Sequence, residues 1–300
     1  MRFGVLDFSY ATFEPFAKAM RVAGAYSVNL GDYAQTIAAR HAYAQLGVPA
    51  EHVVPIDRDT LNHYRGEPTV LLMNGHFHER SLPAAEGIRP LFAGFSALEP
   101  TFARHHAWLK GFAPIGCRDP HTAHLARTYG IEAATTGCVT LTLPRREHEP
   151  AHAKLFVVYG SGAGTLPASV IKQIPDSLAD VSEFVFHRAP AHEHPLPEAT
   201  RRGLESYERQ LLRRLRDEAT LVLTPLHHVA APCMAMGIPV VICRTDNDPR
   251  FGLLSDLTPI YTPDAVHRID WAPKRIDVTE LRQQFLSTVD DLLREARRLD

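Results

Sequence analysis

The chain has 300 residues, of which 45% are hydrophobic and 22% charged, and its formal net charge is −2. This length exceeds one typical hydrophobic core and predicts two domains. The balanced charge argues against a nucleic-acid-binding protein, which would usually carry a basic excess. No apolar run approaches the ~20 residues that span a bilayer, and the first residues lack the apolar segment of a signal peptide. We therefore expect a cytoplasmic protein without a transmembrane segment, and leave peripheral membrane association open.

The first half of the sequence alternates short apolar runs with helical patterns. The apolar runs predict strands, and the three-and-four spacing of apolar residues predicts helices. Asp119 is a suitable N-cap and Pro120 a suitable first residue for one of these helices. The predicted strands are residues 2–8, 53–56, 69–73, 114–117 and 135–143, and the predicted helices are residues 34–48, 100–112 and 120–129.

A polar segment, residues 144–153, is the predicted linker to a second half of the same kind. Residues 189–197 are rich in proline and histidine and are predicted to form a loop. Gly237 is expected to end a helix, because glycine adopts positive φ at little steric cost. The predicted strands are residues 154–159, 181–187, 220–224, 240–243 and 260–262, and the predicted helices are residues 198–218, 229–236 and 279–299.

Strands that alternate with helices on both sides of a linker predict an α/β protein with two Rossmann-like domains facing a cleft, residues 1–147 and 148–300. The last predicted helix is amphipathic and ends the second domain. Open α/β sheets bind ligands outside the carboxyl ends of their strands. The loops that follow the predicted strands are therefore where candidate functional residues are sought.

Two residues are candidates for proton transfer. His227 lies in the loop between a predicted strand and helix, and an imidazole with a pKa near neutrality can act as a general acid. Asp32 lies at the first turn of a predicted helix, where it serves either as a capping carboxylate or as a general base toward an acceptor hydroxyl. Asn29, close to Asp32, either shapes the loop or contacts the acceptor.

A glycine-rich loop follows the strand 154–159. Glycines there allow backbone amides to approach a phosphate closely, although the segment lacks the G-K-[ST] of a P-loop and could equally form a tight turn. His187, Arg188 and Arg250 are further candidates on this side. The loop residues assigned to donor binding are Gly160, Ser161, Gly162, Gly164 and Thr165.

Other polar residues end strands of the first half. Arg118 either pairs with Asp119 or points at substrate anions. Asn74, His76 and His78 are candidates for acceptor contacts. His76 and His78 are spaced like a metal pair, but no third ligand is evident in the sequence. The four cysteines are far apart and form no C-x-x-C motif. We therefore expect neither a metal nor a redox centre.

Three stretches together resemble the polysaccharide pyruvyl transferase family. They are NLGDYAQTIAARHAYAQLG, PIGCRDPHTAHLARTYGIEAATTGCVTLTL and ATLVLTPLHHVAAPCMAMGIPVVI. The resemblance implies a fold similar to GT-B glycosyltransferases and transfer of a pyruvyl group from phosphoenolpyruvate to a pair of sugar hydroxyls. It implies a glycan or a lipid-linked or nucleotide-linked sugar as acceptor, no cofactor beyond the donor substrate, and active-site roles for Asp32 and His227.

One departure from the family pattern concerns the donor. The family's late block, written T-x-R-L-H, carries an arginine where this sequence has Pro225. Such an arginine would hold a phosphate or carboxylate by a charged fork, so another cation is needed here, with Arg188 and Arg250 as candidates. Two alternatives stay open: a sugar-nucleotide-dependent glycosyltransferase on the same scaffold, and a catalytically lapsed, glycan-binding member.

Overall fold

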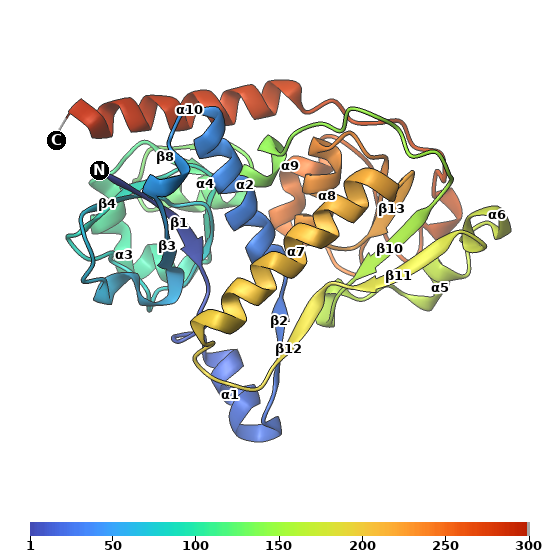
Figure 1. Cartoon of the computed structure of the whole chain (residues 1–300), viewed down its shortest axis with the longest axis horizontal. Coiled ribbons are helices and arrows are strands. Elements are labelled where there is room, and N and C mark those ends of the chain that lie inside the picture. The colour runs from blue at the N-terminus through green and yellow to red at the C-terminus, as the bar shows by residue number, and fades with distance from the viewer. Residues whose placement is uncertain (299–300) are drawn as a thin grey trace.

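The computed structural model describes residues 1–298, and its first half is built on parallel strands. One sheet has the order β3-β1-β4-β6, with β1 Arg2–Asp7, β3 Val53–Asp57, β4 Thr69–Leu72 and β6 Ile88–Leu91. A second sheet has the order β5-β7-β8-β9, with β5 Gly75–Phe77, β7 Phe95–Ala97, β8 Ile115–Cys117 and β9 Ala133–Thr135. The chain passes from β4 into β5 after two residues and from β6 into β7 after three, so the two sheets follow one another along the chain. Figure 1 shows this half around β1, β3, β4 and β8.

The second half contains one five-stranded parallel sheet of order β11-β10-β13-β14-β15. Its strands are β10 Leu155–Tyr159, β11 Ser182–Phe186, β13 Leu221–Thr224, β14 Val240–Cys243 and β15 Ile260–Tyr261. The central strands β13 and β14 are buried along their whole length. Continuous apolar runs are typical of parallel strands covered on both faces, which is why these strands could be predicted from sequence.

A two-stranded antiparallel ribbon joins segments that are far apart in the sequence. β2 Tyr26–Asn29 pairs with β12 Arg188–Ala191, with Arg188 opposite Asn29. The prediction of a loop over residues 189–197 is therefore wrong at its start. The pairing partner lies about 160 residues away, so no local pattern reveals it.

The helices cover both groups of sheets, and several begin as expected. Asp119 caps α4, accepting a hydrogen bond from the Thr122 amide at 2.8 Å, and Gly237 has φ 75°. The helices are α1 Glu14–Ala23, α2 Gly31–Gln45, α3 Glu99–Lys110, α4 Pro120–Thr128, α5 Ala168–Ile171, α6 Asp176–Ala179, α7 Glu198–Glu218, α8 His227–Ala235, α9 Gly252–Ser255 and α10 Thr279–Arg298.

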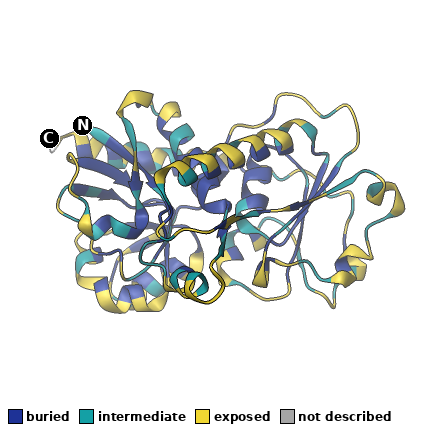
Figure 2. Ribbon diagram, turned by 60° about the horizontal axis from the view of Figure 1, so that its bottom comes forward, coloured by how far each residue is buried: buried dark blue, intermediate teal, exposed yellow. Residues whose placement is uncertain are grey.

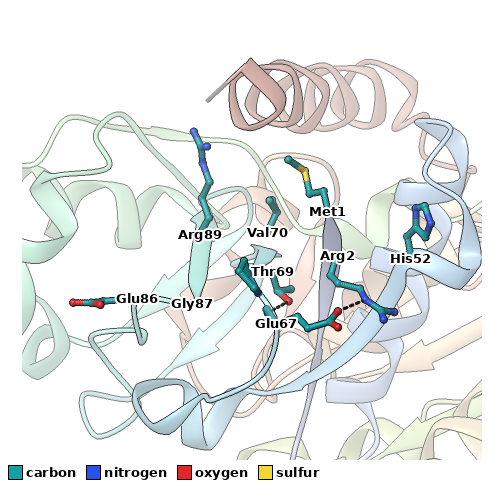
Figure 3. A pocket seen from close by; sticks show the side chains of 10 residues that line it. Met1, Arg2, His52, Glu67, Thr69, Val70, Glu86, Gly87 and Arg89 are labelled. Carbon is teal, nitrogen blue, oxygen red and sulfur yellow. Dashed lines mark hydrogen bonds and ion pairs between the residues drawn. The ribbon is translucent and has the colours of Figure 1, made fainter. Parts of the chain in front are cut away.

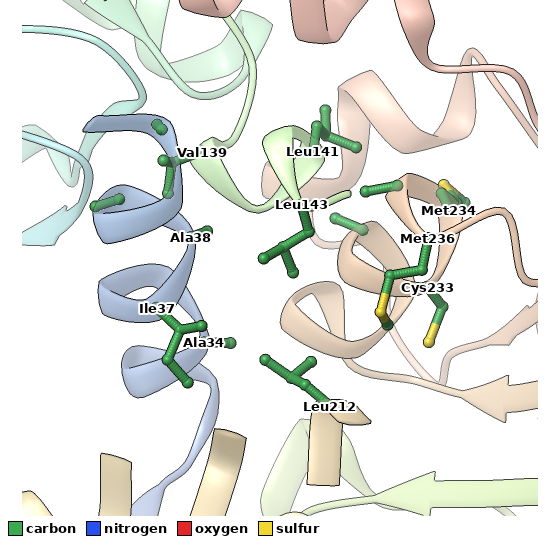
Figure 4. Close-up of a cluster of buried hydrophobic side chains, with 14 of the residues drawn as sticks. Ala34, Ile37, Ala38, Val139, Leu141, Leu143, Leu212, Cys233, Met234 and Met236 are labelled. Atoms are coloured by element: carbon green, nitrogen blue, oxygen red, sulfur yellow. The ribbon is translucent and has the colours of Figure 1, made fainter. Parts of the chain in front are cut away.

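The predicted strand over residues 135–143 is also wrong. β9 ends at Thr135, the chain turns at Gly137 with φ 88°, and Val139–Thr142 form a 3₁₀ turn. The apolar side chains of this turn are buried between helices instead of within a sheet (Figure 4). A short apolar run does not by itself distinguish these two environments.

One buried cluster links the two groups of sheets. Side chains of α2, including Ile37 and Ala38, face Leu141 and Leu143 of the intervening segment and Met234 of α8 (Figure 4). Burying a side chain such as Leu141 stabilises the fold by roughly 1.5–3 kcal/mol. The central strands are buried, whereas edge strands such as β3 and β11 are partly exposed and the helices keep an exposed side (Figure 2). The cluster therefore fixes α2 against α8.

The last helix, α10, runs back along the first half of the chain (Figure 1). Its Phe285 and Val289 are buried in the same cluster, and Arg89 donates a hydrogen bond to the Ala296 carbonyl at 3.0 Å. Within residues 1–298, no helix combines the length and the apolar character needed to cross a membrane.

Candidate functional site

A cavity of about 340 Å³ lies where the two groups of sheets meet. Its lining comes from loops that follow the carboxyl ends of strands in both groups: Arg58 follows β3, Arg118 follows β8, Gly160 follows β10 and His187 follows β11. The carboxyl ends of parallel strands are where open α/β sheets bind ligands. The lining residues are Tyr10, Phe13, Tyr26, Asn29, Asp32, Arg58, His76, His78, Arg118, Gly160, Ser161, Ala163, Gly164, His187, Arg188, Leu226, His227, His228, Arg244, Arg250 and Phe251.

Most of the residues singled out in the sequence line this one cavity, including both Asp32 and His227. Three of them are absent from its lining. Gly162 and Thr165 lie elsewhere in the glycine-rich loop, and Asn74 is fully buried between β4 and β5.

Asp32 stands in the first turn of α2 and is held by two hydrogen bonds. The Tyr10 hydroxyl donates to Oδ2 at 2.6 Å, and the side-chain nitrogen Nδ2 of Asn29 donates to Oδ1 at 3.3 Å. The side-chain oxygen Oδ1 of Asn29 in turn accepts a hydrogen bond from the Gly31 backbone amide at 3.1 Å. Both carboxylate oxygens therefore have a donor, which fixes the side chain beside the cavity.

Gly31 lets α2 approach α8 closely. A Cβ at this position would lie 2.7 Å from the His228 Cβ, closer than real Cβ atoms come. Glycine here is required by contact and not by its backbone conformation. The close approach carries Asp32 on α2 toward His227 and His228 at the start of α8.

Four histidines of the cavity have pKa values below the usual range. Burial lowers the pKa of His227 well below its usual value, and the guanidinium groups of Arg118 and Arg250 lower it further. Burial likewise lowers the pKa of His76, and burial followed by Arg58 lowers that of His78 to about 4. The cavity's positive charge therefore comes from its arginines, which suit a negatively charged ligand.

Five arginines line the cavity, and most are already paired. The Arg58 guanidinium lies 3.0 Å from Asp59, Arg118 donates to the Ser96 hydroxyl at 2.9 Å, and Arg250 binds Asp248. Arg188 donates to the Ser27 hydroxyl at 2.7 Å. These contacts hold the guanidinium groups at the cavity wall.

Arg244 lies beside Pro225. It donates to the Pro225 carbonyl at 2.6 Å and to Asp246 at 2.5 Å, and it stacks 4.3 Å above the Phe251 ring. Its Nε is buried and, among the described residues, has no hydrogen-bond partner. The loop that contains Pro225 thus has a guanidinium group supplied by the end of β14.

His187 forms a buried pair with Glu208 of α7 at 2.8 Å, and both side chains are 1% exposed. A carboxylate that accepts from one ring nitrogen fixes the tautomer and leaves the other nitrogen as an acceptor. Nδ1 of His187 is buried without a partner in the described chain. Nδ1 of His187 is therefore the ring nitrogen left for a hydrogen bond to a ligand.

Three side chains could together hold a metal ion. Ligand atoms of Cys138, His227 and His228 lie within 4.8 Å of one another. The guanidinium groups of Arg118 and Arg250, which depress the histidine pKa values, oppose a cation at this place. The expectation that no metal is bound stays a prediction.

Several lining residues escaped the sequence reading. Arg58 and Arg244 directly follow β3 and β14, so the strand-end rule that selected Arg118 would also have selected them. His78, which follows β5, was expected to contact the acceptor and does line the cavity. Tyr10 follows β1 at a distance of three residues, and no feature of the sequence marks it.

A larger hollow, of about 670 Å³, lies elsewhere, at the amino ends of β1 and β4 (Figure 3). Arg2 and Glu67 form an ion pair across it at 2.8 Å. No residue selected from the sequence lines it.

The comparison with family models supports the interpretation of the sequence motifs. The model described as polysaccharide pyruvyl transferase matches residues 29–247, which include both Asp32 and His227. A search of curated proteins found no match.

Proposed function

The chain belongs to the polysaccharide pyruvyl transferase family, and we propose that it transfers the pyruvyl group of phosphoenolpyruvate to two hydroxyls of a sugar, forming a ketal. The observation that carries this proposal is that Asp32 and His227, from different ends of the matched region, line the same cavity. At about 340 Å³, the cavity is within the range of roughly 300–1,000 Å³ that is usual for small-molecule sites.

The proposed architecture is similar to GT-B enzymes. Residues 1–147 form the acceptor-side domain and residues 148–300 the donor-side domain, with the cavity between them and the polar segment 144–153 as linker. The convergence of strand carboxyl ends from both halves on one cavity supports this division.

The reaction has a simple balance of atoms. Two C–O bonds form between the sugar oxygens and C2 of the donor, and the C2–O bond to phosphate breaks. Of the two hydroxyl protons, one ends on the methylene carbon, which becomes the methyl group, and the other leaves with inorganic phosphate. In this proposal Asp32 takes a proton from the attacking hydroxyl, and His227 supplies a proton to the methylene carbon or to the leaving phosphate.

The donor is proposed to bind among the cations. The glycine-rich loop with Gly160 and Ser161, together with Arg188 and Arg250, provides donors for phosphate and carboxylate oxygens. Arg244, on the Pro225 carbonyl, supplies the guanidinium group that the resemblance implies for this loop. No cofactor is needed, because the donor is itself a substrate.

A bound phosphate would also change the state of His227. Burial, and then the charges of Arg118 and Arg250, lower the pKa of His227 well below its usual value. A doubly charged anion beside it favours the protonated form. Donor binding would therefore convert His227 into the general acid that the reaction needs.

The acceptor is proposed to bind on the other wall, near Asn29, Asp32 and His76. Arg118 lies between the two walls, close enough to His227 to depress its pKa. The acceptor is a glycan or a lipid-linked or nucleotide-linked sugar, and the proposed site of action is the cytoplasm.

The test compares donors by thermal shift and by turnover. Ligands that bind the native state raise its stability, by about 2.7 kcal/mol at 100 times Kd. We expect millimolar phosphoenolpyruvate to raise the melting temperature, and phosphate to be released when p-nitrophenyl galactoside, glucoside or mannoside is added. Stabilisation by UDP or GDP, and not by phosphoenolpyruvate, would instead identify a glycosyltransferase. Stabilisation by a glycoside without turnover would identify a lapsed, glycan-binding member.

A further inference from the structure

Tyr10 has an unusual backbone. Its φ is 58°, and no other non-glycine residue within residues 1–298 has positive φ. An aromatic residue rarely adopts this conformation, which persists only where the surrounding structure enforces it. Such residues cluster at functional sites, and Tyr10 lines the cavity.

Three contacts hold the backbone of Tyr10 in this conformation, one of them a hydrogen bond from the Phe13 amide to the Tyr10 carbonyl at 3.1 Å. The Tyr10 amide donates to the Asp59 carboxylate at 2.9 Å, and its carbonyl lies 3.1 Å from the His194 ring nitrogen. Asp59 is itself fully buried and paired with Arg58 at 3.0 Å. The Arg58 guanidinium lies 4.8 Å from the centre of the Phe8 ring. A buried ion pair is thus arranged around one strained residue.

The side chain of Tyr10 is fixed as firmly as its backbone. Its ring stacks on Phe16 with centroids 5.4 Å apart, and the residue is 3% exposed. Its hydroxyl donates to Asp32 Oδ2 at 2.6 Å. Burial, and then the charge of Asp32, raise the pKa of Tyr10 well above its usual value. The phenol therefore stays protonated and serves only as a donor to the carboxylate.

We infer that Tyr10 is the positioning residue of Asp32. It holds Oδ2 at 2.6 Å, so that the acceptor hydroxyl delivers its proton to Oδ1, which has only the longer 3.3 Å hydrogen bond from the Asn29 side chain. The inference rests on the proposed function of Asp32 as the base. Packing alone would require only the ring, because Phe16 contacts the ring and not the hydroxyl. The strained backbone and the hydroxyl contact together place the phenol where the carboxylate needs a fixed donor.

The alternative is that Tyr10 serves stability alone, and it predicts a different outcome. If the tyrosine is only structural, loss of its hydroxyl hydrogen bond should lower the stability of the fold. If it positions Asp32, the same loss should lower turnover. Tyr43 provides a matched control. It is fully buried, its hydroxyl donates to the Gly4 carbonyl at 3.2 Å, and it is absent from the cavity lining.

The experiment uses the variants Tyr10→Phe, Tyr43→Phe and Asp32→Asn. Turnover is measured as phosphate release from phosphoenolpyruvate, with whichever p-nitrophenyl glycoside is best for the wild type. We expect Tyr10→Phe to lower kcat by roughly 10- to 100-fold, as misplacement of a reacting group does, with an unchanged melting shift in phosphoenolpyruvate. Tyr43→Phe should keep kcat within twofold of the wild type.

Each outcome decides the inference. Wild-type turnover in Tyr10→Phe, combined with loss of turnover in Asp32→Asn, would overturn the role of Tyr10 and leave the proposed function intact. Equal losses in Tyr10→Phe and Tyr43→Phe would reduce Tyr10 to a structural residue. Full turnover in Asp32→Asn, or a wild type that uses no glycoside, would overturn the proposed function together with the inference.

Discussion

The two hollows of this protein lie at opposite ends of its parallel strands and differ in kind. The hollow at the amino ends of β1 and β4 is the larger, at about 670 Å³, but its Arg2 and Glu67 side chains are 43% and 69% exposed. The cavity at the carboxyl ends is half that size, and its Asp32, Arg118 and His187 are 9%, 3% and 1% exposed. Among the described residues of the two linings, buried charged side chains are found only at the smaller cavity.

The difference teaches that volume does not identify the functional end of the sheet. Burying a charge is unfavourable unless it is paired and hydrogen-bonded, so such groups persist in number mainly where they serve a site. The amino-end hollow has an ion pair that solvent screens, whereas the carboxyl-end cavity has perturbed histidines and arginines. Changes in the two hollows should thus have effects of very different size.

We expect the two hollows to differ most in how turnover responds when one carboxylate of each is replaced, Asp32 in the cavity and Glu67 in the amino-end hollow. Asp32→Asn should lower turnover by roughly 10²–10⁴-fold, the usual contribution of a general base, because an amide cannot take the proton. The fold should persist, since the amide oxygen still accepts from Tyr10. Phosphate-release kinetics and melting curves measure the two effects. Turnover at the wild-type level in Asp32→Asn would remove the distinction between the hollows.

The second effect concerns pH. The pKa of His78 is lowered by burial, and then by Arg58, to about 4, and its unfolded value is about 6.5. Between these values the unfolded chain binds a proton that the folded chain does not, so stability falls as pH falls through this window. His76, His227 and His228 shift in the same direction. We expect the melting temperature to drop between about pH 6.5 and 4.

His78→Gln sharpens this test. The variant lacks the titrating ring, so its melting temperature should change less between pH 6.5 and 4 than that of the wild type. His52, in the amino-end hollow, is the matched control, because it is exposed. An identical pH profile for the wild type and His78→Gln would contradict the assignment.

The smallest effect is expected at the amino-end hollow. Glu67→Gln breaks an ion pair with Arg2 whose members are both exposed. Exposed pairs contribute up to about 1 kcal/mol, so the free energy of unfolding should change by no more than this and turnover should not change. Urea denaturation and the phosphate-release assay measure both quantities. A large loss of turnover would mean that the amino-end hollow also serves the reaction.

Much of the fold followed from local sequence patterns. The buried strands β10, β13 and β14 are continuous apolar runs, and α7 begins and ends where its amphipathic pattern does. The cap of α4 could be predicted from the Asp119–Pro120 pair. These features are local, because hydrogen bonding and periodicity act over a few residues.

The candidate site likewise has a part that local sequence patterns predicted and a part that they could not predict. The sequence placed Asp32 and His227 at strand-to-helix junctions, since glycines, prolines and apolar runs locate such junctions. It could not reveal that β12 pairs with β2, that Val139–Thr142 packs between helices, or that Tyr10 adopts φ 58° against Asp32. Those arrangements depend on contacts between residues far apart in the chain, and only the packed tertiary structure determines them.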